Sequence, residues 1–345
     1  MRRRLPCALV LAVLLLGPSA ATADPIYSSM FVFGDSLSDG GNAFLRTGGL
    51  YPPPPYAQRI SNGPVAVEYL AARLGVPLTP SLAGGTNFAV GGAATGQVPI
   101  PGGGGATTDN YATVEYPAVA PLFEGTGIEA QVAAFVAAPP AFDPATALFV
   151  VWGGPNDFFI NPSGATANDA IANMFSHVVG LYGLGARNFL VPNMPDLSLA
   201  PFALALPAVQ RDALHALSMG YNVGLASMLD MLALFPAMNL TQYDTFAFLN
   251  AVTANPAAYG LTNVTDRCFD PMLGLCGSPD QYLYWDGAHP TTRAHQLLGD
   301  EFAAALPQEA VPDPGSTLLL FGISLAGLGA WRRRLQEARP SRNSR

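Results

Sequence analysis

The sequence contains no lysine, and only 12% of its 345 residues are charged. The few basic residues are concentrated at the two ends of the chain, in positions 2–4 and after Trp331. Between Asp24 and Trp331 there are 7 basic and 23 acidic residues, a net charge of −16. A surface with this charge repels nucleic-acid phosphates and anionic lipid headgroups. The scarcity of positive charge therefore argues against a nucleic-acid-binding protein.

Cysteine is almost absent as well, with three residues in the whole chain. Cys7 lies within residues 1–23, which have the three parts of a secretory signal. These are a basic start at 2–4, an apolar run at 9–16 and small residues at 21–23. The alternative, a first transmembrane helix, is disfavoured because the apolar run is too short to span a bilayer comfortably. We therefore predict that residues 1–23 are a signal peptide and that the mature chain folds outside the cytoplasm.

Cleavage of the signal would leave Cys268 and Cys276 as the remaining cysteines. An even pair, close in sequence and in an oxidising compartment, most simply forms a disulfide. Closing so short a loop stabilises a fold by about 2–3 kcal/mol in the chain-entropy model. The alternative is a pair of free buried thiols. A metal site is disfavoured because no nearby histidine or cysteine completes a ligand set.

Apolar runs and segments with helical periodicity alternate along the body of the chain. Residues 147–152 are uninterrupted apolar, as expected of a strand covered on both faces. The alternation predicts one domain with a parallel sheet flanked by helices, and ligands bound beyond the carboxyl ends of the strands. The glycine-rich stretch around Gly102–Gly105 is expected to be flexible. The expected strands are 26–33, 86–90, 147–152, 188–191 and 238–242, and the expected helices are 65–74, 128–138, 170–184, 209–234 and 291–306.

The chain lacks the G-x-S-x-G sequence that surrounds the nucleophile of α/β-hydrolases, which disfavours that fold. Ser36 nevertheless follows the first expected strand directly, in Gly34-Asp35-Ser36-Leu37. A hydroxyl at this place is exposed at the functional edge of the sheet, with its backbone N–H free at a helix start. The alternative is that Ser36 only caps a helix, a position that serine favours.

A serine nucleophile needs a base, and the base needs an acid that orients it. His289 stands in a turn with an acid nearby, in Asp286-Gly287-Ala288-His289-Pro290, where Pro290 can begin the following helix. The three-residue offset lets the carboxylate of Asp286 reach Nδ1 of His289, which leaves Nε2 free for Ser36. The other three histidines are expected to be surface or packed helix residues: His177, His215 and His295.

Catalysis by a serine nucleophile also needs hydrogen-bond donors for the oxyanion that forms on the substrate. Residues 87–93 end an expected strand in Gly91-Gly92, where backbone N–H groups can approach a substrate closely. Residues 153–157 end another expected strand and present the side-chain amide of Asn156. Glycine pairs are common in loops, so each segment is a weak signal alone, but together they supply donors at one edge of the sheet.

Four blocks in this order resemble the GDSL/SGNH hydrolase family. They are Gly34-Asp35-Ser36-Leu37, Asn87 to Ala93, Gly154-Pro155-Asn156-Asp157 and Asp286-x-x-His289. The resemblance implies a flavodoxin-like SGNH-hydrolase fold, a three-layer α/β/α sandwich with a parallel central sheet. It also implies ester hydrolysis through an acyl-serine, without a metal or organic cofactor.

The same resemblance implies a role for each matched residue. Ser36 would be the nucleophile, His289 the base and Asp286 its orienting acid. The oxyanion hole would consist of the backbone N–H groups of Ser36 and Gly92 and the side chain of Asn156, with Gly91 as the alternative to Gly92. Segments 59–64 and 193–196 resemble the lecithinase/hemolysin-like branch of the family, which the cysteine pair also fits.

The end of the chain resembles a PEP-CTERM sorting signal of Gram-negative bacteria. A proline motif at 311–314 precedes an apolar run at 316–331 and the arginines at 332–334, although Asp313 stands where glutamate is usual. The resemblance implies processing by an exosortase and an environment of extracellular polysaccharide. A permanent membrane anchor is the competing interpretation. We therefore expect a hydrolase domain at 24–309 and a sorting tail at 310–345, on an exported protein that is periplasmic, surface-associated or secreted.

The expected function is an exported serine esterase or lipase that acts on small-molecule or lipid acyl esters. One alternative is a deacetylase of O-acetylated extracellular polysaccharide, which the sorting tail favours. An alternative from a different class is an inactive matrix or binding protein on a hydrolase scaffold. That alternative predicts a damaged triad or oxyanion hole, and the sequence shows no such damage.

Overall fold

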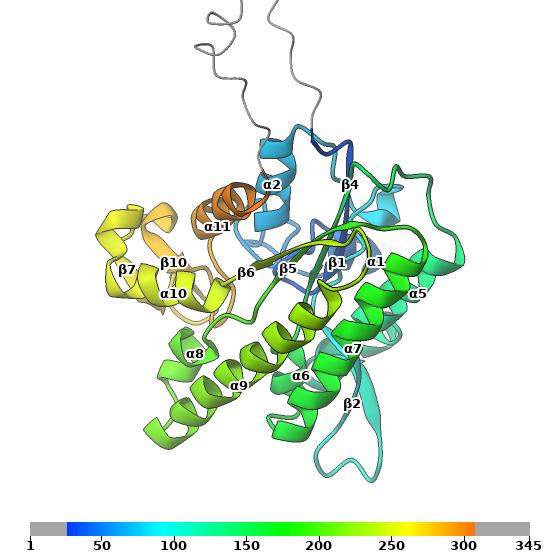
Figure 1. Ribbon diagram of the computed structural model, residues 1–345. Helices are drawn as coiled ribbons and strands as arrows, with labels where there is room; N and C mark the ends of the chain where they lie inside the picture. Colours follow the sequence, from blue (N-terminus) through cyan, green and yellow to red (C-terminus); the bar gives the residue numbers. More distant parts are fainter. Residues whose placement is uncertain (1–25, 308–345) are drawn as a thin grey trace, which may run out of the picture. The chain divides into compact units, whose positions relative to one another are not determined.

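A four-stranded parallel sheet forms the centre of the computed structural model, which describes residues 26–307 (Figure 1). Its strands are β1 (Ser29–Gly34), β4 (Ala147–Trp152), β5 (Asn188–Pro192) and β6 (Asn239–Tyr243), in the order β1-β4-β5-β6. Neighbouring strands pair in parallel throughout. The parallel sheet predicted from the sequence is therefore confirmed. Within residues 26–307 no helix combines the length and the apolar character that a bilayer crossing requires.

The fifth expected strand, residues 86–90, is not a regular strand, so this prediction is wrong in detail. The segment follows β1 through a single parallel bridge between Val32 and Asn87. The backbone N–H of Val32 donates to Thr86 at 3.1 Å, and that of Phe88 donates to Val32 at 2.7 Å. Counted with this segment at the outer edge of β1, the order is that of flavodoxin-like sheets.

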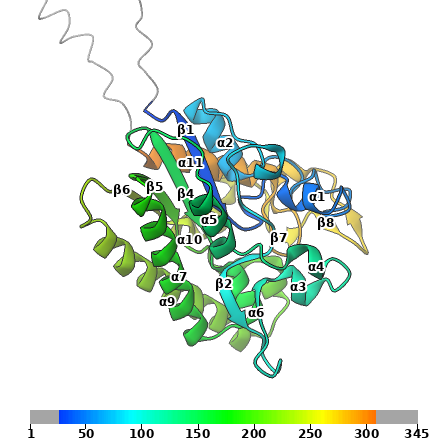
Figure 2. The ribbon, with the colours of Figure 1, turned by 90° about the vertical axis from the view of Figure 1, so that its right-hand side faces the viewer.

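Helices cover both faces of the sheet, as Figures 1 and 2 show. On one face lie α5 (Ile128–Ala137), α7 (Gly164–Gly183) and α9 (Ala208–Leu232), and on the other α2 (Ala66–Leu74) and α11 (Thr292–Ala305). Because strand side chains alternate, Phe31 and Phe149 pack into the first layer and Val32 and Val150 into the second. The result is the expected three-layer α/β/α sandwich.

The start of two helices differs from the sequence-based prediction because a side chain upstream caps the helix. Helix α7 begins six residues earlier than expected, where Ser163 Oγ accepts from the N–H of Thr166. Helix α11 begins after Thr291, whose hydroxyl accepts from the N–H of Ala294, so Pro290 precedes the cap instead of opening the helix.

The glycine-rich stretch after Gly92 contains two strands that the sequence did not indicate, and Gly102–Gly105 lie in the turn between them. β2 (Ala93–Pro99) and β3 (Thr107–Asn110) pair antiparallel across it. The remaining helices and strands are short: α1 (Asn42–Arg46), α3 (Ala112–Glu115), α4 (Ala120–Phe123), α6 (Pro155–Ile160), α8 (Pro201–Leu204), α10 (Thr245–Ala254), β7 (Asn263–Arg267), β8 (Phe269–Asp270), β9 (Gly274–Leu275) and β10 (Tyr282–Tyr284).

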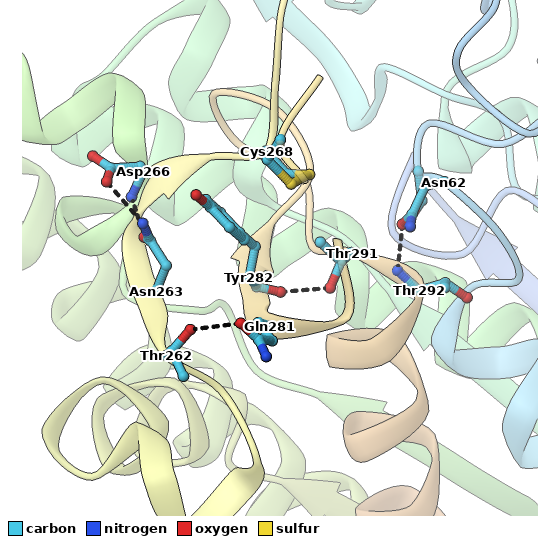
Figure 3. Close-up of a disulfide and its surroundings, with 11 residues drawn as sticks. Asn62, Thr262, Asn263, Asp266, Cys268, Gln281, Tyr282, Thr291 and Thr292 are labelled. Atoms are coloured by element: carbon cyan, nitrogen blue, oxygen red, sulfur yellow. Dashed lines mark hydrogen bonds between the residues drawn. A yellow bond between two sulfur atoms is a disulfide. The ribbon is translucent and has the colours of Figure 1, made fainter. Parts of the chain in front are cut away.

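The predicted disulfide between Cys268 and Cys276 is present, with a Cα–Cα distance of 4.8 Å (Figure 3). It closes the β8–β9 hairpin immediately after β7. The predicted signal peptide and sorting tail lie outside the described residues.

Candidate active site

Ser36 lies in a tight turn at the carboxyl end of β1. The backbone N–H of Ser38 donates to the carbonyl of Asp35 at 3.1 Å, and the N–H of Leu37 donates to Asp35 Oδ1 at 2.9 Å. The expected helix start is wrong, because α1 begins only at Asn42, and Ser36 therefore does not cap a helix. The turn presents the Ser36 hydroxyl beyond the edge of the sheet.

Asp286 and His289 occupy a second turn, between β10 and α11. Asp286 Oδ1 accepts from the backbone N–H groups of Ala288 and His289, each at 2.8 Å. These bonds hold the carboxylate against its own turn, where His289 Nδ1 lies 2.9 Å from both carboxylate oxygens. The three-residue offset thus brings the acid to the imidazole as the sequence predicts.

Two hydrogen bonds at the start of α11 fix the position of this turn (Figure 3). The Thr291 hydroxyl donates to the carbonyl of Tyr282 at 2.7 Å, which ties the start of α11 to β10. The N–H of Thr292 donates to Asn62 Oδ1, also at 2.7 Å. The turn is thereby attached to the loop that precedes α2, far away in the sequence.

The two turns bring Ser36 and His289 into contact across 253 residues of sequence. His289 Nε2 lies 2.9 Å from Ser36 Oγ. With the Nδ1 proton directed at Asp286, Nε2 carries the lone pair, so the Ser36 hydroxyl donates to it. This is the geometry in which an imidazole can remove the proton of a serine hydroxyl.

The electrostatics of the pair favour a charged imidazole. Burial lowers the pKa of His289, but the charge and hydrogen bond of Asp286 outweigh it, and the net pKa is raised. For Asp286, burial raises the pKa, but His289 and the backbone N–H groups of the turn outweigh that effect and lower it. Asp35, next to Ser36, has a pKa raised to about 6 by burial. The site thus stabilises the imidazolium that forms when serine gives up its proton.

The glycine pair after residue 90 presents one free backbone donor. The N–H of Gly91 is already bonded to Asp39 Oδ2 at 2.8 Å. The N–H groups of Gly92 and Ser36 have no acceptor among residues 26–307. Gly92 has a φ of +79°, and a Cβ there would lie 2.4 Å from Asn110 Oδ1, so other residues would be strained.

Asn156 lies in the first turn of α6, where β4 ends. Its side-chain amide donates to the carbonyl of Ala93 at 3.0 Å and to Asp35 Oδ2 at 3.3 Å. The second contact places the amide beside the residue that precedes Ser36. All five residues predicted for the site therefore gather at the carboxyl edge of the sheet: Ser36, Gly92, Asn156, Asp286 and His289.

Sequence reasoning missed Tyr56, which contacts the acid of the site directly. Its hydroxyl donates to Asp286 Oδ2 at 2.8 Å, and its ring packs edge-on against Phe269 and Trp285. Four consecutive prolines at 52–55 indicate only an irregular loop here. A tyrosine after four prolines was the available signal, but nothing in the sequence relates it to a carboxylate 230 residues away.

His215 is a helix residue in α9, as predicted, and it also has an acid partner that the sequence did not indicate. His215 Nδ1 lies 2.7 Å from Asp196 Oδ2, from 19 residues earlier in the chain. The prediction that His177 and His295 are packed helix residues is confirmed. His177 Nε2 contacts the carbonyl of Thr95 at 2.8 Å, and His295 Nδ1 accepts from the N–H of Ala66.

Two cavities meet at Ser36. The first, called here the apolar cavity, has a volume of about 70 Å³ and runs inward from Ser36. The second, called the open cavity, has about 410 Å³ and contains Tyr51, Tyr111, Tyr116 and Asp286 in its wall. Six residues line both of them: Ser36, Asn156, Phe159, Phe202, Ala288 and His289.

A serine–histidine–aspartate arrangement at the carboxyl edge of a parallel α/β sheet is typical of serine hydrolases. A profile of the GDSL-like Lipase/Acylhydrolase family matches residues 30–302 of this chain. The chain therefore belongs to the GDSL-like lipase/acylhydrolase family, and it is a carboxylic ester hydrolase.

The individual relatives described next have low sequence identity to this chain. The thermolabile hemolysin of Vibrio parahaemolyticus is 26% identical over 294 residues, which are 79% of this chain but only 62% of the hemolysin. A GDSL esterase/lipase of Arabidopsis thaliana is 27% identical over an alignment 357 positions long, which covers 88% of this chain and 92% of the plant protein. The crystal structure of a lipolytic G-D-S-L family protein from Veillonella parvula superposes with a TM-score of 0.43 and 13% identity, over 80% of this chain and 96% of that one.

The C-terminal resemblance to a bacterial sorting signal is confirmed in a particular form. A VPDSG-CTERM motif matches residues 310–335. Val311-Pro312-Asp313 agree with the first three letters of this motif, which accounts for the aspartate that departs from the PEP pattern. The motif indicates export and surface association in a bacterium.

Proposed function

We propose that this protein is an exported serine ester hydrolase in which Ser36 is the nucleophile, His289 the general base and Asp286 its orienting acid. The observation that carries the proposal is the 2.9 Å contact between His289 Nε2 and Ser36 Oγ, with Nδ1 held by Asp286. Hydrolysis of p-nitrophenyl butyrate together with labelling by a fluorophosphonate tests it. A purified, folded protein that does neither would contradict the proposal.

The reaction follows from these contacts in two steps. Ser36 Oγ attacks the ester carbonyl while its proton passes to His289 Nε2. The same proton then goes to the oxygen of the leaving alcohol as the C–O bond breaks, which leaves an acyl-serine. Water attacks this intermediate with His289 again as the base, and the carboxylic acid and the free serine result.

The oxyanion of each tetrahedral intermediate needs donors that are in place beforehand. The free N–H groups of Ser36 and Gly92 support their assignment to this role, and the engagement of the Gly91 N–H with Asp39 argues against Gly91. The side-chain amide of Asn156 would be the third donor.

Asn156→Ala should lower kcat by about 100- to 1,000-fold with a small effect on KM, the range found for the loss of one oxyanion donor. Steady-state kinetics on a soluble ester measure this. Asn161, just after the same helix, donates to the carbonyl of Pro99 instead, and Asn161→Ala serves as the control. Unchanged kcat in a folded Asn156→Ala protein would remove Asn156 from the oxyanion hole.

The pH dependence of the reaction should report His289. Because its pKa is raised and only the neutral imidazole accepts the serine proton, kcat/KM should fall on the acid side with a midpoint above 6.5. Tyr56→Phe removes a donor from Asp286, which strengthens the pull of that carboxylate on the imidazolium and should move the midpoint upward. Tyr116→Phe, in the same cavity wall, should leave the midpoint in place. A midpoint that does not move in Tyr56→Phe would show that the tyrosine only packs there.

The sorting motif supports the remaining part of the proposal, which concerns location. Residues 1–23 act as a signal peptide, residues 24–309 are the hydrolase domain, and residues 310–345 are a sorting tail on the surface of a Gram-negative bacterium. An exosortase-type enzyme near extracellular polysaccharide is the processing partner that this tail suggests. The mass of the protein recovered from the cell surface tests both cleavage sites.

A further inference from the structure

The position of Ser36 between two unlike cavities bears on how an ester lies in the site. The apolar cavity continues inward between α10, α11 and β10, whereas the open cavity leads outward past the tyrosines. Ser36 and His289 line both cavities. The two halves of an ester bound at Ser36 would therefore point into different cavities.

The wall of the apolar cavity is mostly aliphatic and aromatic, although the hydroxyls of Thr245 and Tyr284 also belong to lining residues. Its lining away from the reacting atoms includes Leu197, Phe248, Leu249, Leu283, Ala294 and Leu298. Phe248 and Leu249 come from α10, and Ala294 and Leu298 from α11. A group that enters this space exchanges water for carbon contacts, which favours an alkyl chain over a sugar.

Two carboxylates line this cavity, and both already have hydrogen-bond partners. Asp35 accepts from the N–H of Leu37 and from the side-chain amide of Asn156. Asp196 Oδ1 accepts from the N–H and hydroxyl of Ser198, at 3.1 and 2.6 Å. Its Oδ2 lies 2.7 Å from His215 Nδ1. A sugar hydroxyl in the cavity would compete with these partners. The hydrogen bonds of Asp196 thus stabilise the fold, and its carboxylate does not make the cavity a polar subsite.

The open cavity has the opposite character. It is about six times larger, and its wall contains Glu115 and Arg267 beside four tyrosines. A wall with both charged and aromatic side chains can hold a bulky or polar group. The smaller apolar cavity has room only for a narrow group such as an unbranched chain.

We propose that the apolar cavity is the acyl subsite, which takes an unbranched aliphatic chain longer than acetyl, and that the open cavity receives the alcohol. The inference rests on the proposed function, since it places the carbonyl carbon at Ser36 Oγ. When the C–O bond breaks, the alcohol takes its proton from His289 and leaves through the open cavity. The acyl chain stays buried on Ser36 until water releases it.

For the unmodified protein, kcat/KM on p-nitrophenyl esters should rise from acetate with each methylene until the chain fills the cavity. The expected increase is about fourfold per methylene, the usual gain from burying one CH₂. A second series, acetate esters of alcohols of growing length, should show a much weaker dependence. Acetate as the best acyl group would overturn the proposal and favour a deacetylase of polysaccharide.

Leu249→Trp should fill part of the apolar cavity, because Leu249 lines it and is only partly buried. The ratio of kcat/KM for octanoate to that for acetate should fall at least tenfold. Ala247→Trp adds the same ring to the same helix at an exposed position outside the cavity wall, and should leave the ratio unchanged. If Leu249→Trp does not fold, Leu249→Ala should instead shift the best acyl chain to a greater length.

The outcomes separate this inference from the proposed function. A protein that reacts with a fluorophosphonate but whose chain-length profile is unaffected by both Leu249 variants would overturn the acyl subsite and leave Ser36 as nucleophile. A profile in which Leu249→Trp changes the alcohol series instead of the acyl series would reverse the assignment of the two cavities. A protein that neither hydrolyses esters nor takes the label would contradict the proposed function itself.

Discussion

Ser36→Ala should lower kcat/KM for every ester by about 10⁶-fold, the scale seen when the nucleophile of another serine hydrolase is removed. The reason is that, among residues 26–307, Ser36 supplies the hydroxyl that is hydrogen-bonded to His289 Nε2. The same variant should lose all covalent labelling by a fluorophosphonate, which intact-mass spectrometry measures directly. The fold should be unaffected, because the turn at residue 36 is held by backbone bonds around Asp35.

Ser38→Ala is the matched control for this result. Ser38 is in the same turn and fully buried, and its hydroxyl has no hydrogen-bond partner among the described residues. Removing that hydroxyl should therefore leave activity near the wild-type level and stability equal or slightly higher. If Ser36→Ala kept its label, or if Ser38→Ala lost it, the nucleophile would have been assigned to the wrong residue.

Asp286→Asn should lower kcat by about 10⁴-fold through the tautomer of His289. The two N–H groups of the turn require an acceptor at the Oδ1 position, so the carbonyl oxygen of the new amide remains there. The amide nitrogen then takes the place of Oδ2 and faces His289 Nδ1 as a donor. Nδ1 must accept, Nε2 becomes protonated, and it can no longer take the proton of Ser36.

Asp270→Asn provides a comparison with nearly the same local geometry. Asp270 Oδ1 accepts from the N–H groups two and three residues onward, those of Met272 and Leu273, just as Asp286 does in its own turn. No histidine faces Asp270 in the described structure, so Asp270→Asn should leave kcat unchanged. The substitution also removes the ion pair between Asp270 and Arg267. An equal loss in the two variants, measured on folded proteins, would mean that Asp286 serves only to shape its turn.

The central sheet could be predicted because its strands are unusually apolar. Residues 147–152 form a strand with the predicted bounds, since six consecutive buried side chains leave no other solution between two helical layers. Residues 86–90 were harder. They form hydrogen bonds with β1 at the edge of the sheet, but they pair with it as a bridge at one residue only. The hydrophobicity of the sequence does not distinguish such a segment from a regular strand. The β2–β3 hairpin was missed because its turn is rich in glycine.

The site was predictable where spacing along the chain determines contact. The offset from Asp286 to His289 is local, and a turn closes it in the way the sequence indicates. The contact of His289 with Ser36, which is distant in sequence, was predicted from the residue types and the family resemblance, but other contacts between distant segments were not. The bond from Tyr56 to Asp286 and that from Gly91 to Asp39 depend on how loops cross after the sheet has formed. The second of these distinguishes Gly92 from Gly91 as a donor, a choice that the sequence left open.

The distance in sequence between Ser36 and His289 has a consequence for the synthesis of the protein. Ser36 is among the first parts of the domain to leave the ribosome, while His289 and α11 are among the last. In the proposed mechanism, a nascent chain therefore holds a serine without its base and cannot cleave an ester. Activity would begin only when the turn before α11 docks beside β1, so a chain that is still being made would not yet be a working esterase.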